Sequence, residues 1–185
     1  MPILQDFLRH EMPAHLAVQV RSCIRTQWPF LTRENTQLWN YTPQANPSRH
    51  FMLTEGELLI SHAAANVREI SHQGRNWRVA GLSTVFTYPD RRGAGFAGQV
   101  VAAATRYILQ SDADLAMLFA GHPLQKFYAT HGWSAVPDAR ILFGSPQSPV
   151  LKTDNLVMML FLSPFACDYR EWFTKQDFYV GESTW

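Results

Sequence analysis

The sequence predicts an α/β (α+β) fold in which helices flank a central sheet within a single domain. The chain has 185 residues, a length typical of one domain. Hydrophobic residues make up 46% of the chain and charged residues 17%, which favours a sizeable core and argues against global disorder. Segments with strand and helix periodicity alternate along the chain, and no internal repeat is present.

The first half of the chain predicts one helix and then a run of strands. Apolar residues at helical spacing predict a helix over Ala14–Trp28, which Pro29 ends. The polar, proline-containing stretch Arg33–Ser48 predicts a loop suited to substrate contacts. Strands are expected at His50–Thr54, Leu58–Ile70 and Trp77–Tyr88, with a hairpin turn over Ser71–Asn76.

The second half predicts two helices, three strands and an aromatic tail. Helices are expected at Phe96–Gln110 and Pro123–Thr130, and strands at Leu115–Ala120, Trp133–Phe143 and Leu156–Leu162, the last two linked by Gly144–Asn155. The tail, Ser163–Trp185, carries seven aromatic residues. So much aromatic surface should pack on the domain or on a second copy of the chain, so a homodimer stays an open alternative.

Charge and cysteine usage exclude several classes of function. The formal net charge is only +1, which points to neither nucleic acid nor an anionic membrane. Cys23 and Cys167 match no zinc or redox spacing, which predicts reduced thiols in a cytoplasmic protein and no metal site. Met1–Met12 lacks the apolar run of a signal peptide, and the longest apolar stretch, Leu156–Leu162, is too short to cross a bilayer.

A basic, glycine-rich turn follows the strand that Pro89 ends. Arg91-Arg92-Gly93-Ala94-Gly95 leads directly into the expected helix at Phe96. The first N–H groups of a helix have no intrahelical partner and lie at the positive end of its dipole, so a pyrophosphate can bind there. Small residues let the backbone approach the phosphates. Taken alone, the glycines could equally serve only to relieve strain in a strand-to-helix turn.

Residues Pro89–Gly98 resemble the acyl-CoA-binding turn of the GNAT superfamily of N-acyltransferases. That turn has the form Arg/Gln-x-x-Gly-x-Gly/Ala, which Arg92, Gly95 and Ala97 match. The resemblance implies a GNAT-like, mixed and mostly antiparallel central sheet flanked by helices. It also implies an acyl-CoA-dependent N-acyltransferase with acetyl-CoA as the co-substrate and a small-molecule amine as the acceptor.

A second landmark of the family follows at its usual distance. Phe127–Trp133 resembles the tyrosine and glycine-aromatic pair that close the family's next helix. The two motifs in order extend the resemblance over Leu58–Val136.

By match to these motifs, Tyr128 is expected to donate a proton to the leaving thiolate. The expected acyl-CoA-binding residues are Val85, Phe86, Thr87, Arg92, Gly93, Ala94, Gly95, Phe96, Ala97 and Gly98.

The chain is most similar, within the superfamily, to aminoglycoside 2′-N-acetyltransferases. Cys167-Asp168-Tyr169 and the terminal Trp185 resemble that family's Cys-Asp-Trp segment and final tryptophan. The similarity implies substrate-binding roles for Asp154 and Trp185. The chain departs from the family at two acidic positions, where it has Ser83 in place of a glutamate base and Ser183 in place of an aspartate.

The sequence therefore does not identify the general base. Ser83 is a poor base but is able to hold a catalytic water. The other candidates are His62, Glu69, Asp154, Asp168 and the carboxylate of Trp185. Two alternatives also stay open: an N-acyltransferase that uses a longer acyl donor, and a non-catalytic acyl-CoA-binding module.

Overall fold

The computed structural model describes residues 1–29, 48–153, 155–182 and 184. The chain forms two compact units. Unit 1 comprises Met1–Asn66 and Thr84–Thr105, and unit 2 comprises Val67–Ser83 and Arg106–Trp185. The expected extent of one domain over residues 1–185, with 163–185 as an extension, stays a prediction.

The main sheet has seven strands in the hydrogen-bonding order β1-β2-β3-β4-β5-β9-β6. The strands are β1 (Ile3–Leu8), β2 (Ser48–Glu55), β3 (Leu58–His72), β4 (Arg75–Thr87), β5 (Leu115–Ala120), β6 (Ser134–Ala135) and β9 (Leu156–Phe161). The pairs β1–β2, β2–β3, β5–β9 and β6–β9 are antiparallel, whereas β4 and β5 are parallel. This mostly antiparallel sheet, flanked by helices, confirms the predicted fold class.

A second, smaller sheet of three strands belongs to unit 2. Its order is β10-β7-β8, with β7 at Arg140–Phe143, β8 at Val150–Leu151 and β10 at Asp177–Tyr179. The longer helices are α1 (Ala14–Gln27) and α2 (Phe96–Leu109). The short ones are η1 (Arg9–Glu11), η4 (Pro89–Arg91), η5 (His122–Leu124), α3 (Gln125–Ala129), α4 (Pro164–Asp168) and α5 (Arg170–Thr174). No helix in these described parts has the length and apolar character needed to cross a bilayer.

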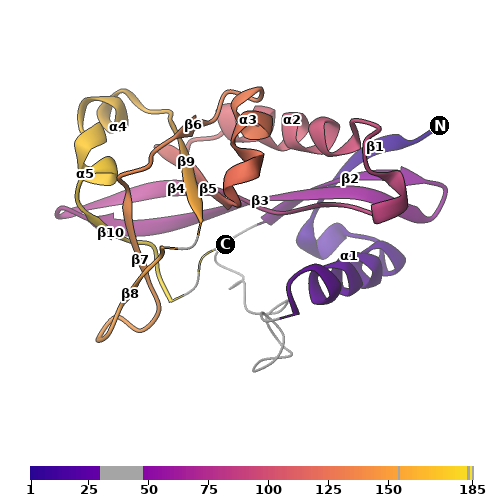
Figure 1. The fold of residues 1–185 in the computed structure, drawn as a ribbon, viewed down its shortest axis with the longest axis horizontal. Coiled ribbons are helices and arrows are strands. Elements are labelled where there is room, and N and C mark those ends of the chain that lie inside the picture. Colours follow the sequence, from indigo (N-terminus) through magenta and orange to yellow (C-terminus); the bar gives the residue numbers. More distant parts are fainter. Residues whose placement is uncertain (30–47, 154, 183, 185) are drawn as a thin grey trace. The chain divides into compact units, whose positions relative to one another are not determined.

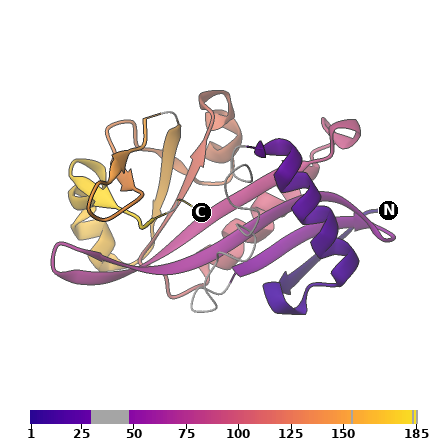
Figure 2. The same ribbon diagram turned by 90° about the horizontal axis from the view of Figure 1, so that it is seen from below.

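Within unit 1, α1 and the first turns of α2 lie on opposite faces of strands β2 and β3 (Figures 1 and 2). The apolar face of α1 packs on the sheet through Leu16, Val20 and Cys23, which share a core with Met52 and Phe86. These helix residues follow the spacing of the predicted apolar stripe.

The core of unit 2 is built around the fully buried Trp77 of β4. Its ring meets Phe173 edge-on, with 4.8 Å between the ring centroids, and its Nε1–H donates to the His72 carbonyl oxygen over 3.0 Å. Phe173 and Phe178, both from the aromatic tail, are fully buried in this core. The tail therefore packs inside unit 2.

The structure departs from the predicted secondary structure at three places. The expected strand Trp133–Phe143 is split into β6 and β7, which pair in different sheets and flank Pro137. Proline lacks the N–H that a continuous ladder needs there. The expected linker Gly144–Asn155 contains the short strand β8. The edge strand β1 also forms where no strand was expected.

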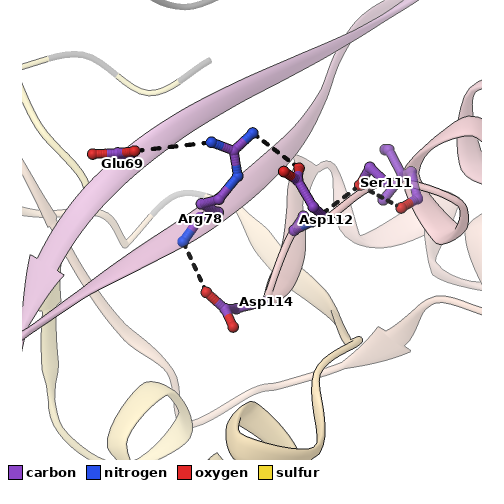
Figure 3. A network of polar contacts seen from close by, with 7 residues as sticks. Glu69, Arg78, Ser111, Asp112 and Asp114 are labelled. Atoms are coloured by element: carbon purple, nitrogen blue, oxygen red, sulfur yellow. Dashed lines mark hydrogen bonds and ion pairs between the residues drawn. The ribbon is translucent and has the colours of Figure 1, made fainter.

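Polar contacts fix the start of β5 beside β4 in unit 2 (Figure 3). The Asp114 carboxylate accepts a hydrogen bond from the Arg78 N–H over 3.0 Å, and the Asp114 N–H donates to the Arg78 carbonyl over 2.7 Å. The Arg78 guanidinium contacts Asp112 at 2.9 Å and Glu69 at 3.8 Å. These two ion pairs lie in solvent, so we expect them to contribute little to stability.

We therefore expect Asp114→Ala to destabilise the protein more than Asp112→Ala. The first change leaves the Arg78 N–H without its acceptor, which costs about 1–2 kcal/mol, whereas the second removes an exposed ion pair worth less than about 1 kcal/mol. Urea unfolding of both variants measures the difference. Equal losses would show that the guanidinium contacts, and not the backbone bond, stabilise this corner.

Candidate active site

The turn between β4 and α2 has the geometry of an anion site. Gly93 and Gly95 have φ angles of +83° and +76°, which are left-handed values that other residues rarely adopt. An added Cβ at either glycine would meet no atom within 4 Å. Within the protein, glycine is therefore required here by backbone conformation rather than by space.

The first N–H groups of α2, which directly follows the turn, make no hydrogen bonds within the helix. The bond from the Gln99 N–H to the Gly95 carbonyl, at 3.4 Å, marks the beginning of the i−4 ladder. The N–H groups that precede Gln99 point toward the start of the helix, where its dipole is positive. Residues 92–95 are exposed and residues 96–98 are half-buried, so the start of α2 lies at the surface of unit 1.

The two arginines of the turn have different environments. The Arg91 guanidinium lies 3.2 Å from a carboxylate oxygen of Glu55 on β2, and this ion pair offsets its charge. Arg92 instead bonds to neutral groups: its Nε–H donates to the Thr87 carbonyl over 3.1 Å and its Nη2 to the Gln27 amide oxygen over 3.5 Å. Arg92 therefore carries the larger positive potential at the turn.

The last residues of β4 are held by hydrogen bonds to β3. The Ser61 hydroxyl donates to the Phe86 carbonyl over 2.9 Å and lies 2.8 Å from the Thr87 hydroxyl. The Tyr88 N–H donates to the Ile60 carbonyl over 3.0 Å. Of the three positions expected to bind pantetheine, the Phe86 and Thr87 carbonyls thus already have partners, and Val85 is half-buried.

An irregular residue precedes these positions in β4. Thr84 has a φ of +48°, although it is β-branched, and its buried hydroxyl has no hydrogen-bond partner among the described residues. Such a left-handed residue interrupts a strand ladder and costs about 1 kcal/mol or more. Ser83, immediately before it, is 9% exposed.

A buried row of side chains leads to this irregular residue. Ser48 Oγ lies 3.1 Å from His50 Nε2, His50 Nδ1 lies 2.9 Å from His62 Nε2, and His62 Nδ1 lies 2.8 Å from the Thr84 carbonyl oxygen. His62 stacks on Phe86 with 5.2 Å between the ring centroids. Sequence reasoning missed His50 and this connection, although histidines at inward-facing strand positions are an available signal.

Burial holds both imidazoles neutral. Desolvation is the main cause that lowers the pKa of His62 to about 4, and the bond to the Thr84 carbonyl opposes it. Desolvation, followed by repulsion from His62 and Arg9, lowers the pKa of His50 to about 2. Both ring nitrogens of His62 are engaged, which argues against His62 as the general base.

Tyr128 lies on α3 in unit 2 and is only 6% exposed. Burial raises the pKa of its hydroxyl to about 12, so the group is protonated at neutral pH, as a proton donor must be. Gly132 has a φ of +89° and ends the segment, and the Trp133 N–H donates back to the Tyr128 carbonyl over 3.3 Å. Trp133 itself is buried, which explains the glycine-aromatic pair as a structural feature.

The predicted acceptor-binding residues Asp154 and Trp185 lie outside the described residues, as does most of the expected loop Arg33–Ser48. Of the other expected bases, Glu69 contacts Arg78 and Asp168 is exposed on α4. Among residues that the structure describes, no three His, Cys, Asp or Glu side chains gather as metal ligands would.

Comparison with known proteins identifies the family. The model of the acetyltransferase (GNAT) domain matches residues 12–136, which is more than half of the chain. This chain belongs to the GNAT acetyltransferase family. The match includes both the turn after β4 and Tyr128. No curated protein matches the sequence significantly.

Solved GNAT structures share the fold at low sequence identity. The Escherichia coli GNAT family N-acetyltransferase YhbS in complex with CoA has a TM-score of 0.61 and 14% identity, covering 96% of this chain and 88% of its own. A Brucella melitensis GNAT family acetyltransferase in complex with acetyl-CoA has a TM-score of 0.56 and 14% identity. The match covers 88% of this chain and 90% of the Brucella chain.

An aminoglycoside 6′-N-acetyltransferase complexed with coenzyme A is also similar, with a TM-score of 0.57. Its identity to this chain is 11%, over 88% of this chain and 98% of its own. These likenesses establish the GNAT fold and leave the 2′-aminoglycoside resemblance as a hypothesis.

The buried histidines predict a loss of stability in acid. Because the pKa of His62 in the folded protein, about 4, lies below its ordinary value of 6.5, unfolding takes up a proton between these pH values. Stability present above the ordinary pKa should therefore fall as the pH drops. The slope of the free energy of unfolding against pH measures the number of protons taken up on unfolding. Urea unfolding between about pH 7 and pH 4 should show that His62→Asn reduces this number by about one.

The buried, non-titratable Met52 of the same unit supplies the control for that titration. Met52→Leu should leave the slope as it is in the parent protein. If His62→Asn and the parent protein lose stability in parallel as the pH falls, His62 is not buried and neutral.

Proposed function

We propose that this chain is an N-acetyltransferase that transfers an acetyl group from acetyl-CoA to a primary amine of a small molecule. The observation that carries the proposal is the turn after β4, where two left-handed glycines present the amino end of α2 to solvent. Membership of the GNAT acetyltransferase family supports the same donor.

The donor binds largely through main-chain groups in this proposal. Its diphosphate accepts hydrogen bonds from the N–H groups of residues 93–98, and the Arg92 guanidinium supplies a positive charge beside them. The pantetheine arm lies along Val85–Thr87. Arg91 contributes less, because Glu55 already neutralises it.

The reaction then needs one bond to form and one to break. The neutral amine nitrogen attacks the thioester carbonyl carbon, and the resulting oxyanion accepts a hydrogen bond from a strand N–H. The carbon–sulfur bond breaks, the sulfur leaves as a thiolate, and the Tyr128 hydroxyl gives it a proton. The amine loses its proton to a water molecule, which we assign to Ser83, and solvent reprotonates Tyr128.

A non-catalytic acyl-CoA-binding module is the second candidate. The engaged ring nitrogens of His62 and the ion pair of Glu69 favour it, because each removes a candidate base. A longer acyl donor has less support, since the tail aromatics Phe173 and Phe178 that suggested it are buried in the core of unit 2.

The acceptor class and the location complete the proposal. A net charge of +1 supports neither nucleic acid nor an anionic membrane as a partner. Cys23 and Cys167 are both free thiols, which supports a cytoplasmic location. Release of free CoA thiol from acetyl-CoA, measured across aminoglycosides, polyamines and amino acids, tests the activity. Thermal stabilisation by CoA without turnover of any amine would support the second candidate instead.

Gly95→Glu should abolish most of the CoA affinity. The change places a carboxylate against the proposed diphosphate and a side chain on a left-handed backbone. We expect the dissociation constant, measured by calorimetry, to rise by at least about 10-fold. Gly74→Glu is the matched control, because Gly74 has a similar φ of +73° and equally open space in the β3–β4 turn. Similar CoA affinities in both variants would remove the site from this turn.

Tyr128→Phe should lower kcat by about 10²-fold while the affinity for CoA stays unchanged. The ring keeps its buried packing and only the proton donor is lost. Steady-state kinetics and calorimetry on the same preparation separate the two quantities. The exposed Tyr169, changed to Phe, controls for loss of a phenol hydroxyl in unit 2. Full turnover by Tyr128→Phe would assign the acid to another group.

A further inference from the structure

The side chains behind Thr84 form a hydrogen-bond chain with a single direction. The Thr84 carbonyl oxygen only accepts hydrogen bonds, so His62 Nδ1 must carry the proton that it shares over 2.8 Å. Neutral His62 then accepts at Nε2, which makes His50 Nδ1 the donor at 2.9 Å. His50 Nε2 in turn accepts from the Ser48 hydroxyl at 3.1 Å. Each donor in this row thus points toward β4.

The chain ends on the peptide group that joins Thr84 to Val85. The structure contains no cis peptide bond in its described parts, so the carbonyl and the N–H of this peptide point in opposite directions. The bond from His62 therefore orients the Val85 N–H away from the imidazoles. Val85 is one of the positions proposed to face the acyl-CoA thioester.

We propose that Ser48, His50 and His62 are positioning residues that orient and polarise the Val85 N–H as the hydrogen-bond donor for the oxyanion of acetyl transfer. This inference rests on the proposed function, because the oxyanion forms only if the chain transfers an acyl group. None of the three side chains touches the substrate: they act through the Thr84–Val85 peptide. Hydrogen bonds in such a row polarise one another, which makes the terminal N–H a stronger donor.

The unfavourable conformation of Thr84 explains why neighbouring side chains are needed to hold the Thr84–Val85 peptide in place. Its left-handed φ of +48° and its buried hydroxyl, which has no partner among the described residues, both disfavour the observed arrangement. A conformation of this kind persists only where its surroundings hold it. The fully buried His62, stacked on Phe86 and bonded at both ring nitrogens, is a rigid group that can hold it.

Burial assigns the imidazoles to orientation rather than to proton transfer. The lowered pKa values of His62 and His50 show that neither ring gains a proton readily near neutral pH. A general base must accept a proton from the amine, and His62 has no ring nitrogen left for it. What these rings can supply is a fixed N–H donor to the Thr84 carbonyl.

The matched variants His62→Asn and His62→Leu test the proposal. Their side chains have nearly the same size and shape, so both open a similar cavity, and both remove the His62 Nε2 atom that His50 Nδ1 contacts. Only asparagine places an N–H group near the position of His62 Nδ1. We expect kcat to fall by about 10-fold or more in His62→Leu, to be largely restored in His62→Asn, and CoA affinity to change little in either. Equal kcat values at equal thermal stability would overturn the proposal.

NMR spectroscopy provides a second test, which examines the hydrogen-bond chain from Ser48 to Thr84 without enzymatic turnover. The ¹⁵N shifts of the His50 and His62 rings should show protons on Nδ1 in both. The amide proton of Val85 should move upfield in His62→Leu and stay near its original position in His62→Asn. An unchanged Val85 amide in His62→Leu, or a proton on His62 Nε2, would overturn the inference whatever the kinetics show.

The two measurements keep the inference separate from the proposed function. If the parent protein binds CoA but acetylates no amine, the enzyme proposal fails, and with it the role of Val85 in transfer. If the parent protein acetylates an amine while both His62 variants behave alike, the activity stands and the positioning role is rejected.

Discussion

The left-handed backbone at Thr84 sets the direction of the backbone groups that follow it in β4. An extended strand alternates its amides from side to side, and one left-handed residue shifts that alternation for Val85–Thr87. The departure costs about 1 kcal/mol or more, so it needs support from its neighbours. Ser61 and His62 of β3 provide it, because they bond to the Phe86 and Thr84 carbonyls on either side of Val85.

Anion binding at the proposed site after β4 relies on backbone N–H groups more than on the two arginines of the turn. Arg91 is paired with Glu55, and Arg92 uses its Nε–H to tie the turn to the Thr87 carbonyl. The remaining attraction for an anion comes from the Arg92 charge and from the N–H groups at the start of α2. Those N–H groups are fixed by the φ angles of Gly93 and Gly95. In the proposed function, a short glycine pattern is therefore enough to position the groups that recognise a diphosphate.

Sequence periodicity predicted helices and strands that bury apolar residues in a regular pattern. It did not predict features that depend on which strands pair and in which register. The predicted helix over Ala14–Trp28 is confirmed as α1, and the apolar run Leu115–Ala120 as β5. The strand β1 was missed, since it lies at an edge where Ile3 and Leu4 stay exposed. The histidine chain could not be predicted, because it joins residues of three strands whose contact depends on the register of β2 against β3. The glycine conformations of the turn after β4 were predictable because their constraint is local to a few residues, whereas phosphate binding there stays a prediction.

The division between main-chain and side-chain recognition also explains why the donor can be proposed more specifically than the acceptor. A donor held by glycine conformations and helix amides, as proposed for the turn after β4, constrains few side chains, so such a site tolerates wide sequence divergence. An acceptor amine is recognised by side chains, and the sequence replaces the resembled family's glutamate with Ser83. A buried serine beside Thr84 cannot neutralise a polycationic amine as a glutamate would.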